Sequence, residues 1–287
     1  MRTLREALAD ARRDRYAIPH FNVTDLAQLR AIARVARELG TPVLVGTSEG
    51  ERGYVGVARA VALVRSYRAE GVPLYLNADH THSVERIEEA ARAGYDAVLF
   101  DGGALSWEDN VLMTTAAVQI ARSVDPAIVV EGELGYIGSG SSILDALPEG
   151  AALTDAAMTS PEQAAVFVKE TGIDLLAPAV GNIHGMLRSG SNPRLDIKRI
   201  DAIELAAGVP LVLHGGSGTP DEDLQAACRG GIAVAHVSTE LRVAWRAGTE
   251  RALREMPDEV NPAKLMQPAE DEVYAAALRR AKLFLGR

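Results

Sequence analysis

The chain has 287 residues, of which 47% are hydrophobic and 24% are charged. This length and composition support a large buried core, which excludes a disordered chain and a small disulfide-stapled domain. The 30 Lys and Arg residues and 39 Asp and Glu residues give a net charge of −9, so we expect no nucleic-acid partner and no binding to anionic membranes.

Eight short apolar runs are distributed along the chain, and each is typical of a buried parallel strand. In chain order the predicted strands are residues 17–23, 42–46, 73–77, 96–100, 127–131, 174–178, 210–214 and 233–237. Six runs follow a glycine that can end the preceding helix as its C-cap. These glycines are Gly40, Gly71, Gly94, Gly172, Gly208 and Gly231.

Amphipathic stretches that are typical of helices lie between the predicted strands. Ser160-Pro161 and Thr219-Pro220 each precede a Gln or Glu at the third helical position, which predicts two capping boxes with proline in the first turn. A further helix is predicted near residues 268–285. Because strands and helices alternate without a linker, we predict a single α/β domain over residues 1–287, a (β/α)8 TIM barrel with an additional C-terminal helix.

The cellular location is predicted from what the sequence lacks. Cys228 is the one cysteine, so an internal disulfide is excluded. The first 19 residues are too charged for the core of a signal peptide, and no apolar run reaches the length of a membrane span. We therefore expect a cytoplasmic protein with no membrane partner.

The barrel prediction places the functional site where the strands end and the following loops begin. His80, His184 and His214 follow three different strands at this end. A lone histidine there is usually a hydrogen-bonded loop residue, but three imidazoles with an open position form the ligand set of a catalytic zinc. Asp101 or Glu133 could add an oxygen ligand to the same ion or to a neighbouring one.

The other histidines are interpreted differently from one another. His82 and His20 are interpreted as supporting or structural residues, because the first follows His80 by two positions and the second lies within a predicted strand. His236 lies near the barrel mouth in the last strand and is retained as a candidate substrate contact.

A glycine-rich run after the seventh strand and two hydroxyl residues after the eighth suggest a phosphate site, because such loops often hold phosphate in these barrels. The run alone would equally fit a tight turn, and a helical arginine is usually solvated. The candidate phosphate- and substrate-binding residues are Asn22, Gly181, Gly215, Gly216, Ser217, His236, Ser238, Thr239 and Arg242.

Five segments, taken as an ordered set, resemble the motifs of the class II, metal-dependent ketose-bisphosphate aldolases, which include fructose-1,6-bisphosphate aldolases. The segments are residues 77–80, 130–135, 181–185, 213–218 and 238–240. The resemblance spans almost the whole chain. It implies reversible, zinc-dependent cleavage of fructose 1,6-bisphosphate to dihydroxyacetone phosphate and glyceraldehyde 3-phosphate through a metal-stabilised enediolate, in glycolysis or gluconeogenesis.

The resemblance also implies roles for individual residues. His80, His184 and His214 would be the zinc ligands, and Asp79 would donate the proton, although an aspartate at this position could instead cap a loop. The carboxylates of Asp101 and Glu133 would match a second or displaced divalent-ion position. A monovalent cation, Na⁺ or K⁺, is expected near the phosphate-binding residues, and a homodimer or homotetramer is expected as the assembly.

Three positions depart from the family pattern. The loop of residues 135–149 lacks the paired acids that usually supply a base in this family. Glu149 is therefore predicted as the catalytic base, with Asp145 as an alternative. The glycines and serines of the loop predict a mobile lid. His236 stands where the family commonly has asparagine. Ser238 stands at a position that varies between members acting on fructose and tagatose bisphosphates.

These departures leave alternatives open. The chain could cleave tagatose bisphosphate or another phosphorylated ketose, it could be a metal-dependent sugar-phosphate epimerase or isomerase, or it could bind phosphorylated sugars without catalysis. Cobalt, manganese or iron could replace zinc on the same ligands, because metal selectivity depends on availability as well as geometry.

Overall fold

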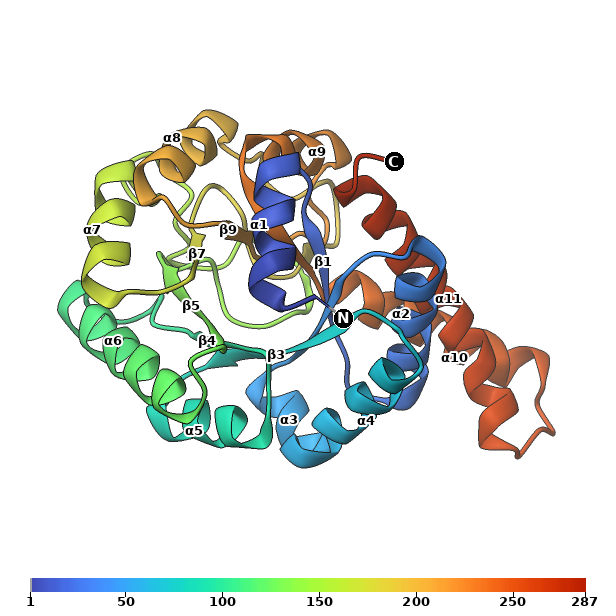
Figure 1. Cartoon of the computed structure of the whole chain (residues 1–287). Coiled ribbons are helices and arrows are strands. Elements are labelled where there is room, and N and C mark those ends of the chain that lie inside the picture. Colours follow the sequence, from blue (N-terminus) through green and yellow to red (C-terminus); the bar gives the residue numbers. More distant parts are fainter. Residues whose placement is uncertain (1) are drawn as a thin grey trace.

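The computed structural model describes residues 2–287 and contains eight parallel strands closed into a barrel (Figure 1). The order around the barrel is β1-β10-β9-β7-β5-β4-β3-β2. The strands are β1 (Ile18–Asn22), β2 (Val43–Thr47), β3 (Leu74–Thr81), β4 (Ala97–Phe100), β5 (Val129–Leu134), β7 (Leu175–Pro178), β9 (Leu211–Leu213) and β10 (Ile232–Val237). Each overlaps one predicted strand, so the barrel prediction is confirmed.

Helices form a ring around the strands (Figure 1). They are α2 (Leu26–Leu39), α3 (Glu49–Val55), α4 (Val57–Ala69), α5 (Val84–Ala93), α6 (Trp107–Val124), α7 (Pro161–Thr171), α8 (Ile197–Ala207), α9 (Asp221–Gly230) and α10 (Thr239–Glu255). Their apolar faces pack on the outside of the barrel, as Leu29, Ile32 and Val35 of α2 illustrate. Among the residues described, no helix has the length and apolar character needed to span a membrane.

The predicted helix ends are confirmed with two exceptions. Five of the six glycines are C-caps, whereas Gly71 lies one residue beyond the cap of α4. Ser160 forms the predicted capping box of α7. The second predicted box is wrong, because α9 begins after Pro220 and the Thr219 hydroxyl donates to the carbonyl of Gly215 (3.1 Å) instead. This hydrogen bond stabilises the glycine-rich turn.

Elements outside the repeating pattern close the barrel and extend it. Helix α1 (Leu4–Asp14) buries Leu4 and Leu8 against the N-terminal half of the barrel interior. The predicted C-terminal helix is α11 (Pro262–Phe284), which begins six residues earlier than expected and packs on α10 and α2. Figure 1 shows α10 and α11 extending together away from the barrel. A two-stranded sheet, β6 (Ile143–Leu144) with β8 (Met186–Leu187), was not predicted.

Candidate active site

The inside of the barrel changes from apolar to polar along each strand. Inward-facing residues recur at every second position of a strand. On β3 they are Tyr75, which belongs to the apolar floor, then Asn77, and then Asp79. On β5 the corresponding inward-facing residues are Val129, Glu131 and Glu133. Other polar inward residues are His20 and Asn22 of β1, His214 after β9 and His236 of β10, all buried. Polar chemistry is thus confined to the C-terminal half of the barrel.

Asp79 and His80 are consecutive, yet both line the same cavity. A β-bulge makes this arrangement: between Ala78 and Thr81 the pairing of β3 with β4 shifts by one residue. His80 has φ +39°, a left-handed conformation that is unfavourable for any residue other than glycine. The bulge therefore overrides the alternation of side chains that a regular strand would impose.

The cavity has a volume of about 330 Å³ and collects most of the predicted site residues. Those that line it are Asn22, Asp79, His80, Asp101, His184, His214, Gly215, Ser217, His236, Ser238, Thr239 and Arg242. Glu133 lies behind this lining, with one carboxylate oxygen 3.8 Å from Nδ1 of His80. Gly181, Gly216 and Glu149 do not contribute to the lining.

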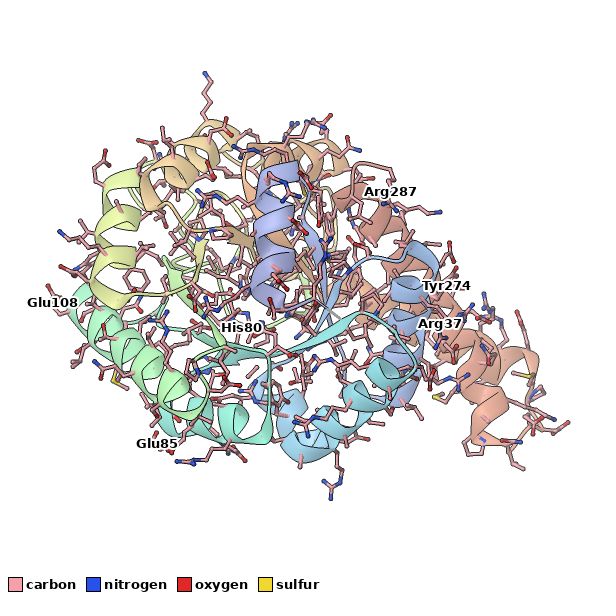
Figure 2. The ribbon with its side chains drawn as sticks, in the orientation of Figure 1. Arg37, His80, Glu85, Glu108, Tyr274 and Arg287 are labelled. Atoms are coloured by element: carbon pink, nitrogen blue, oxygen red, sulfur yellow. The ribbon has the colours of Figure 1, made fainter. Side chains whose placement is uncertain are left out.

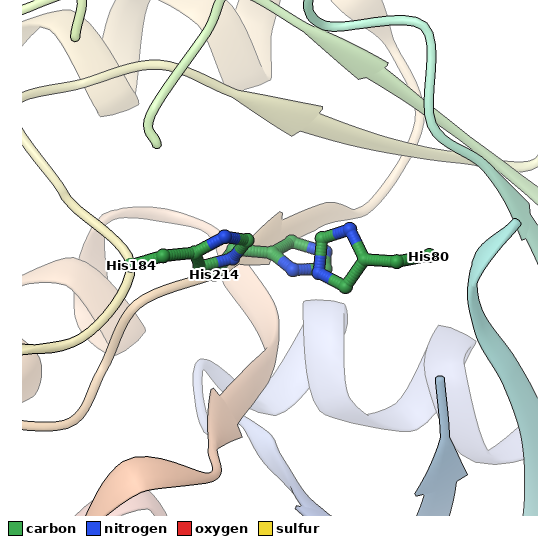
Figure 3. A group of neighbouring side chains, drawn as sticks. All are labelled: His80, His184 and His214. Atoms are coloured by element: carbon green, nitrogen blue, oxygen red, sulfur yellow. The ribbon is translucent and has the colours of Figure 1, made fainter. Parts of the chain in front are cut away.

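The three predicted ligand histidines converge from different elements (Figure 3). Their ring centroids are 4.7 to 5.7 Å apart and their planes are inclined by 62 to 84°. One nitrogen from each ring lies within 4.8 Å of a nitrogen of the other two rings. Figure 2 shows His80 toward the inside of the barrel, whereas the labelled Glu85 and Glu108 lie on the outer helices.

Each of these rings has one nitrogen held by the protein. Nδ1 of His80 contacts Asp101 (2.7 Å), Nδ1 of His184 contacts the carbonyl of Gly138 (3.0 Å), and Nε2 of His214 contacts Glu131 (2.7 Å). A carbonyl or an ionised carboxylate only accepts, so beside such a partner the held nitrogen carries the hydrogen and the other nitrogen of the ring can ligate a metal. The three histidines thus fit a zinc ion with one open position.

Burial and charge set the protonation of these rings. Burial lowers the pKa of His184 and of His214 to about 3, so both are neutral at physiological pH, as metal ligands must be. Burial also opposes charge on His80, but the nearby carboxylates of Asp79 and Asp101 outweigh it and raise the pKa of His80 to about 10. A metal ion that binds here displaces that proton.

Four carboxylates surround the histidines. Burial raises the pKa of Glu131 to about 8 and the pKa of Glu133 well above its usual value, and in both cases a neighbouring aspartate adds to the shift. Burial has the same tendency at Asp79 and Asp101, but hydrogen bonds and nearby histidines hold their pKa values below the usual range. In the metal-free site the neutral forms of Glu131 and Glu133 are therefore favoured, and a bound divalent cation would favour their ionised forms.

A further pair of histidines stands beside the ligand set. The rings of His20 and His236 are stacked, with centroids 3.4 Å apart and planes 3° from parallel. Together with Asp79 they offer three potential ligand atoms within 4.8 Å, but parallel rings direct their lone pairs side by side rather than toward one point. We therefore interpret this pair as part of the cavity wall and not as a metal site.

The predicted phosphate loops meet at the first turn of α10. A Cβ on Gly215, at φ +68°, would lie 2.1 Å from the carbonyl of Ile183, so the turn requires glycine. The Ser217 hydroxyl accepts from the backbone N–H groups of Ser238 (3.3 Å) and Glu240 (3.2 Å). Backbone donors and hydroxyls at the beginning of a long helix suit a phosphate.

Two predicted residues are arranged differently from expectation. Arg242 lines the cavity, but it donates to the carboxylate of Glu51 (2.8 Å) and to the carbonyl of Ser141 (2.9 Å), so it connects α10 to α3 and to the loop after β5. Glu149 is exposed and outside the cavity, and Asp145 pairs with Arg188 (2.6 Å). The structure therefore does not bring the predicted loop base to the site, and its catalytic role stays a prediction.

Sequence reasoning missed the residues that orient the site. Glu131 was given no role, although its carboxyl contacts Nε2 of His214 and fixes that ring. Glu51 accepts from Asn22 (2.9 Å), and the same amide donates to Asp79 (2.8 Å). Only the two-residue step from Val129 to Glu131 could have indicated that this carboxylate faces inward.

Comparisons with known proteins agree over nearly the whole chain. The family model of class II fructose-bisphosphate aldolase matches residues 2–286. The fructose-bisphosphate aldolase of Geobacillus stearothermophilus is 32% identical over 98% of this chain and 96% of its own length, and the probable fructose-bisphosphate aldolase of Bacillus subtilis (strain 168) is 33% identical with the same coverage.

Solved structures give the same result. The YdjI aldolase of Escherichia coli K12 has a TM-score of 0.81 and 32% identity, over 98% of this chain and 96% of that one. A putative fructose-1,6-bisphosphate aldolase of Coccidioides immitis has a TM-score of 0.83 and 28% identity, over 97% of this chain and 94% of that one.

Proposed function

Because the chain belongs to the class II fructose-bisphosphate aldolases, a family of metal-dependent lyases that act on phosphorylated sugars, we propose that it reversibly cleaves fructose 1,6-bisphosphate to dihydroxyacetone phosphate and glyceraldehyde 3-phosphate. The observation that carries the proposal is the convergence of His80, His184 and His214, each with one ring nitrogen held and one free, in a cavity that also reaches the phosphate loops.

The three histidines would hold the catalytic zinc, because imidazole nitrogens are ligands that zinc prefers. When bound, the ion acts as a Lewis acid on the carbonyl and adjacent hydroxyl oxygens of the ketose. Asp101 and Glu133 form a second candidate group with His80, in which three ligand atoms lie within 4.8 Å. This group is the proposed second divalent-ion position.

Asp79 is the proposed proton donor and acceptor at the C4 oxygen of the substrate. One of its carboxylate oxygens is held by the amide of Asn22, and the other lies 3.5 Å from Nδ1 of His236 without a hydrogen bond from the described residues. The carboxylate is thus oriented by one contact and keeps a free oxygen for a substrate hydroxyl.

The phosphate of the dihydroxyacetone half is proposed to bind at Gly215, Ser217, Ser238 and Thr239, with a monovalent cation nearby. In the strand order, β9 and β10 stand opposite β3 and β4. A substrate bound at this end therefore extends across the histidines toward Asp79. The loop that contains Gly138 to Ser141 lines the cavity and would exclude water when substrate is bound.

The cellular setting is proposed from the family alone. We propose a cytoplasmic enzyme of glycolysis or gluconeogenesis that works as a homodimer or homotetramer.

The test is a coupled assay of triose phosphates released from fructose 1,6-bisphosphate, run on metal-replete protein, after chelation, and after zinc is restored. Cleavage should disappear with chelation and return with zinc. His80→Ala should lose both zinc and cleavage. His82→Ala is the control: His82 is more than half exposed, and removal of its ring beside Glu49 and Asp101 leaves all three proposed histidine ligands in place, so zinc should be retained. Full zinc content and full cleavage in His80→Ala would overturn the assignment.

A further inference from the structure

We propose that Arg52 is a positioning residue: its guanidinium holds the bulge of β3 in the conformation that directs Asp79 and His80 into the cavity. Arg52 lies on α3, is 4% exposed and does not line the cavity. The part of the inference that concerns turnover rests on the proposed aldolase function. The part that concerns metal affinity depends only on the ligand histidines.

The guanidinium connects three points around the bulge. Nη1 donates to the carbonyl of Thr47, the last residue of β2, and to the carbonyl of Asp79 (3.0 Å). Nη2 donates to the hydroxyl of Thr81 (2.8 Å), where pairing with β4 resumes. The planar group with several fixed donors therefore spans the bulge from its first residue to its end.

The contact at the carbonyl of Asp79 has a direct geometric consequence. That carbonyl belongs to the peptide plane between Asp79 and His80, so fixing its direction constrains both ψ of Asp79 and φ of His80. These two angles determine where the two side chains point. Asp101 fixes the ring of His80 through Nδ1 (2.7 Å), but it does not hold the backbone.

The conformation of His80 explains why such a contact is needed. A histidine at φ +39° is unfavourable by itself and persists only where the surroundings determine it. Beyond the pair Thr47 and Ala78, the β2–β3 ladder has ended, so strand pairing no longer restrains the chain on that side. The three hydrogen bonds of Arg52 begin where the ladder stops.

Burial of this arginine also argues for a specific role. Among the described residues, its hydrogen-bond acceptors are two carbonyls and a hydroxyl, and none is a carboxylate. An arginine buried away from water without a paired carboxylate is uncommon, because desolvation of its charge is incompletely compensated. The cost is understandable if the guanidinium geometry is what maintains the bulge.

The test compares three variants. Arg52→Met keeps the length of the side chain and removes the donors, and Arg52→Lys restores a cation without the planar fork. Arg68→Met is the matched control, because Arg68 lies on the neighbouring helix α4 and donates to the carbonyl of Leu74 (2.6 Å) at the other end of β3. Zinc affinity is measured by competition with a chelator, and kcat and KM are measured on zinc-saturated protein.

We expect Arg52→Met to weaken zinc binding about 10- to 100-fold, as is typical when a residue that orients a ligand is removed. In saturating zinc, kcat should fall more than KM rises, because Asp79 is misdirected while the phosphate loops are intact. Arg52→Lys should recover part of both losses. Arg68→Met should lower the unfolding temperature and leave zinc affinity unchanged.

Native zinc affinity and kcat in folded Arg52→Met would overturn the inference, as would an equal loss of zinc affinity in Arg68→Met. If Arg52→Met fails to fold, zinc affinity and kcat are measured on Arg52→Lys instead. A purely structural role predicts native zinc affinity in the folded fraction of that variant, whereas the inference predicts weaker affinity. If the native protein binds zinc but cleaves no phosphorylated ketose, the proposed function fails while the zinc measurement still tests Arg52.

Discussion

Glu131→Gln tests how the structure prepares His214 to bind a metal. The carboxylate of Glu131 accepts from Nε2 of His214 at 2.7 Å, and Nδ1 of this buried ring has no partner among the described residues. Burial raises the pKa of the Glu131 carboxyl to about 8, and a divalent cation bound at Nδ1 of His214 would favour its ionised form. The ionised carboxylate only accepts, so it keeps the hydrogen on Nε2 and leaves the lone pair on Nδ1 for the ion. Glutamine at position 131 has nearly the same shape but can also present its NH₂ group to Nε2. The hydrogen then moves to Nδ1, and the ring cannot ligate.

The expected loss follows from this change of tautomer. Removal of a residue that orients a metal ligand typically weakens binding by about 10- to 100-fold, which corresponds to about 1.4 to 2.7 kcal/mol. Competition with a chelator of known zinc affinity measures it directly. The matched control is Glu270→Gln, which replaces a buried carboxylate that pairs with Arg30 and Arg34 far from the cavity. Zinc affinity within twofold of the native value in Glu131→Gln would refute the assignment of His214 as a ligand held by Glu131.

Two predictions concern stability. The Cβ of Gly46→Ala would lie 2.1 Å from Cε1 of His20, so the ring must move. We expect the free energy of unfolding, measured in urea, to fall by about 1 to 3 kcal/mol. An unchanged free energy of unfolding would contradict this packing. Burial disfavours charge on Glu240, but Arg280 outweighs it and lowers the pKa of Glu240. Glu240→Gln should therefore lower the free energy of unfolding by about 2 kcal/mol at pH 7. The difference between variant and native protein should shrink as the pH falls below 4.5, the pKa of the carboxyl in the unfolded chain. A difference that does not change with pH would exclude this pairing.

The fold was predictable because the signals were local and repeated. A C-capping glycine before an apolar run, and an amphipathic stretch after it, recur along the chain and require no knowledge of distant contacts. The capping box at Thr219 failed because a competing local contact won: the hydroxyl that would cap α9 instead donates to the carbonyl of Gly215, four residues earlier. Helix α1 was missed because it covers the barrel floor and lies outside the repeating unit.

The convergence of the candidate ligand histidines was predictable from the sequence, and what orients them was not. Parallel strands bring their C-terminal ends together, so the meeting of His80, His184 and His214 at one end of the barrel could be predicted from position. The roles of Glu131 and Arg52 depend on register and on a bulge that only the three-dimensional pairing reveals. Glu149 does not line the cavity, and the pairing of β6 with β8 in the preceding part of its loop is a contact that the sequence does not indicate.

Gly46 of β2 carried a signal for the stacked histidines that the sequence analysis did not use. Gly46 was interpreted only as the end of an apolar run, although glycine in a strand often marks the close approach of another group. Here that group is the ring of His20, which is in register with His236 on the adjacent strand. A side chain at position 46 would occupy the space of the ring. Gly46 makes room for the ring of His20, and the ring of His236 covers one face of it. Asparagine in place of His236 would leave that face uncovered. Positions 20, 46 and 236 should therefore be varied together rather than one at a time.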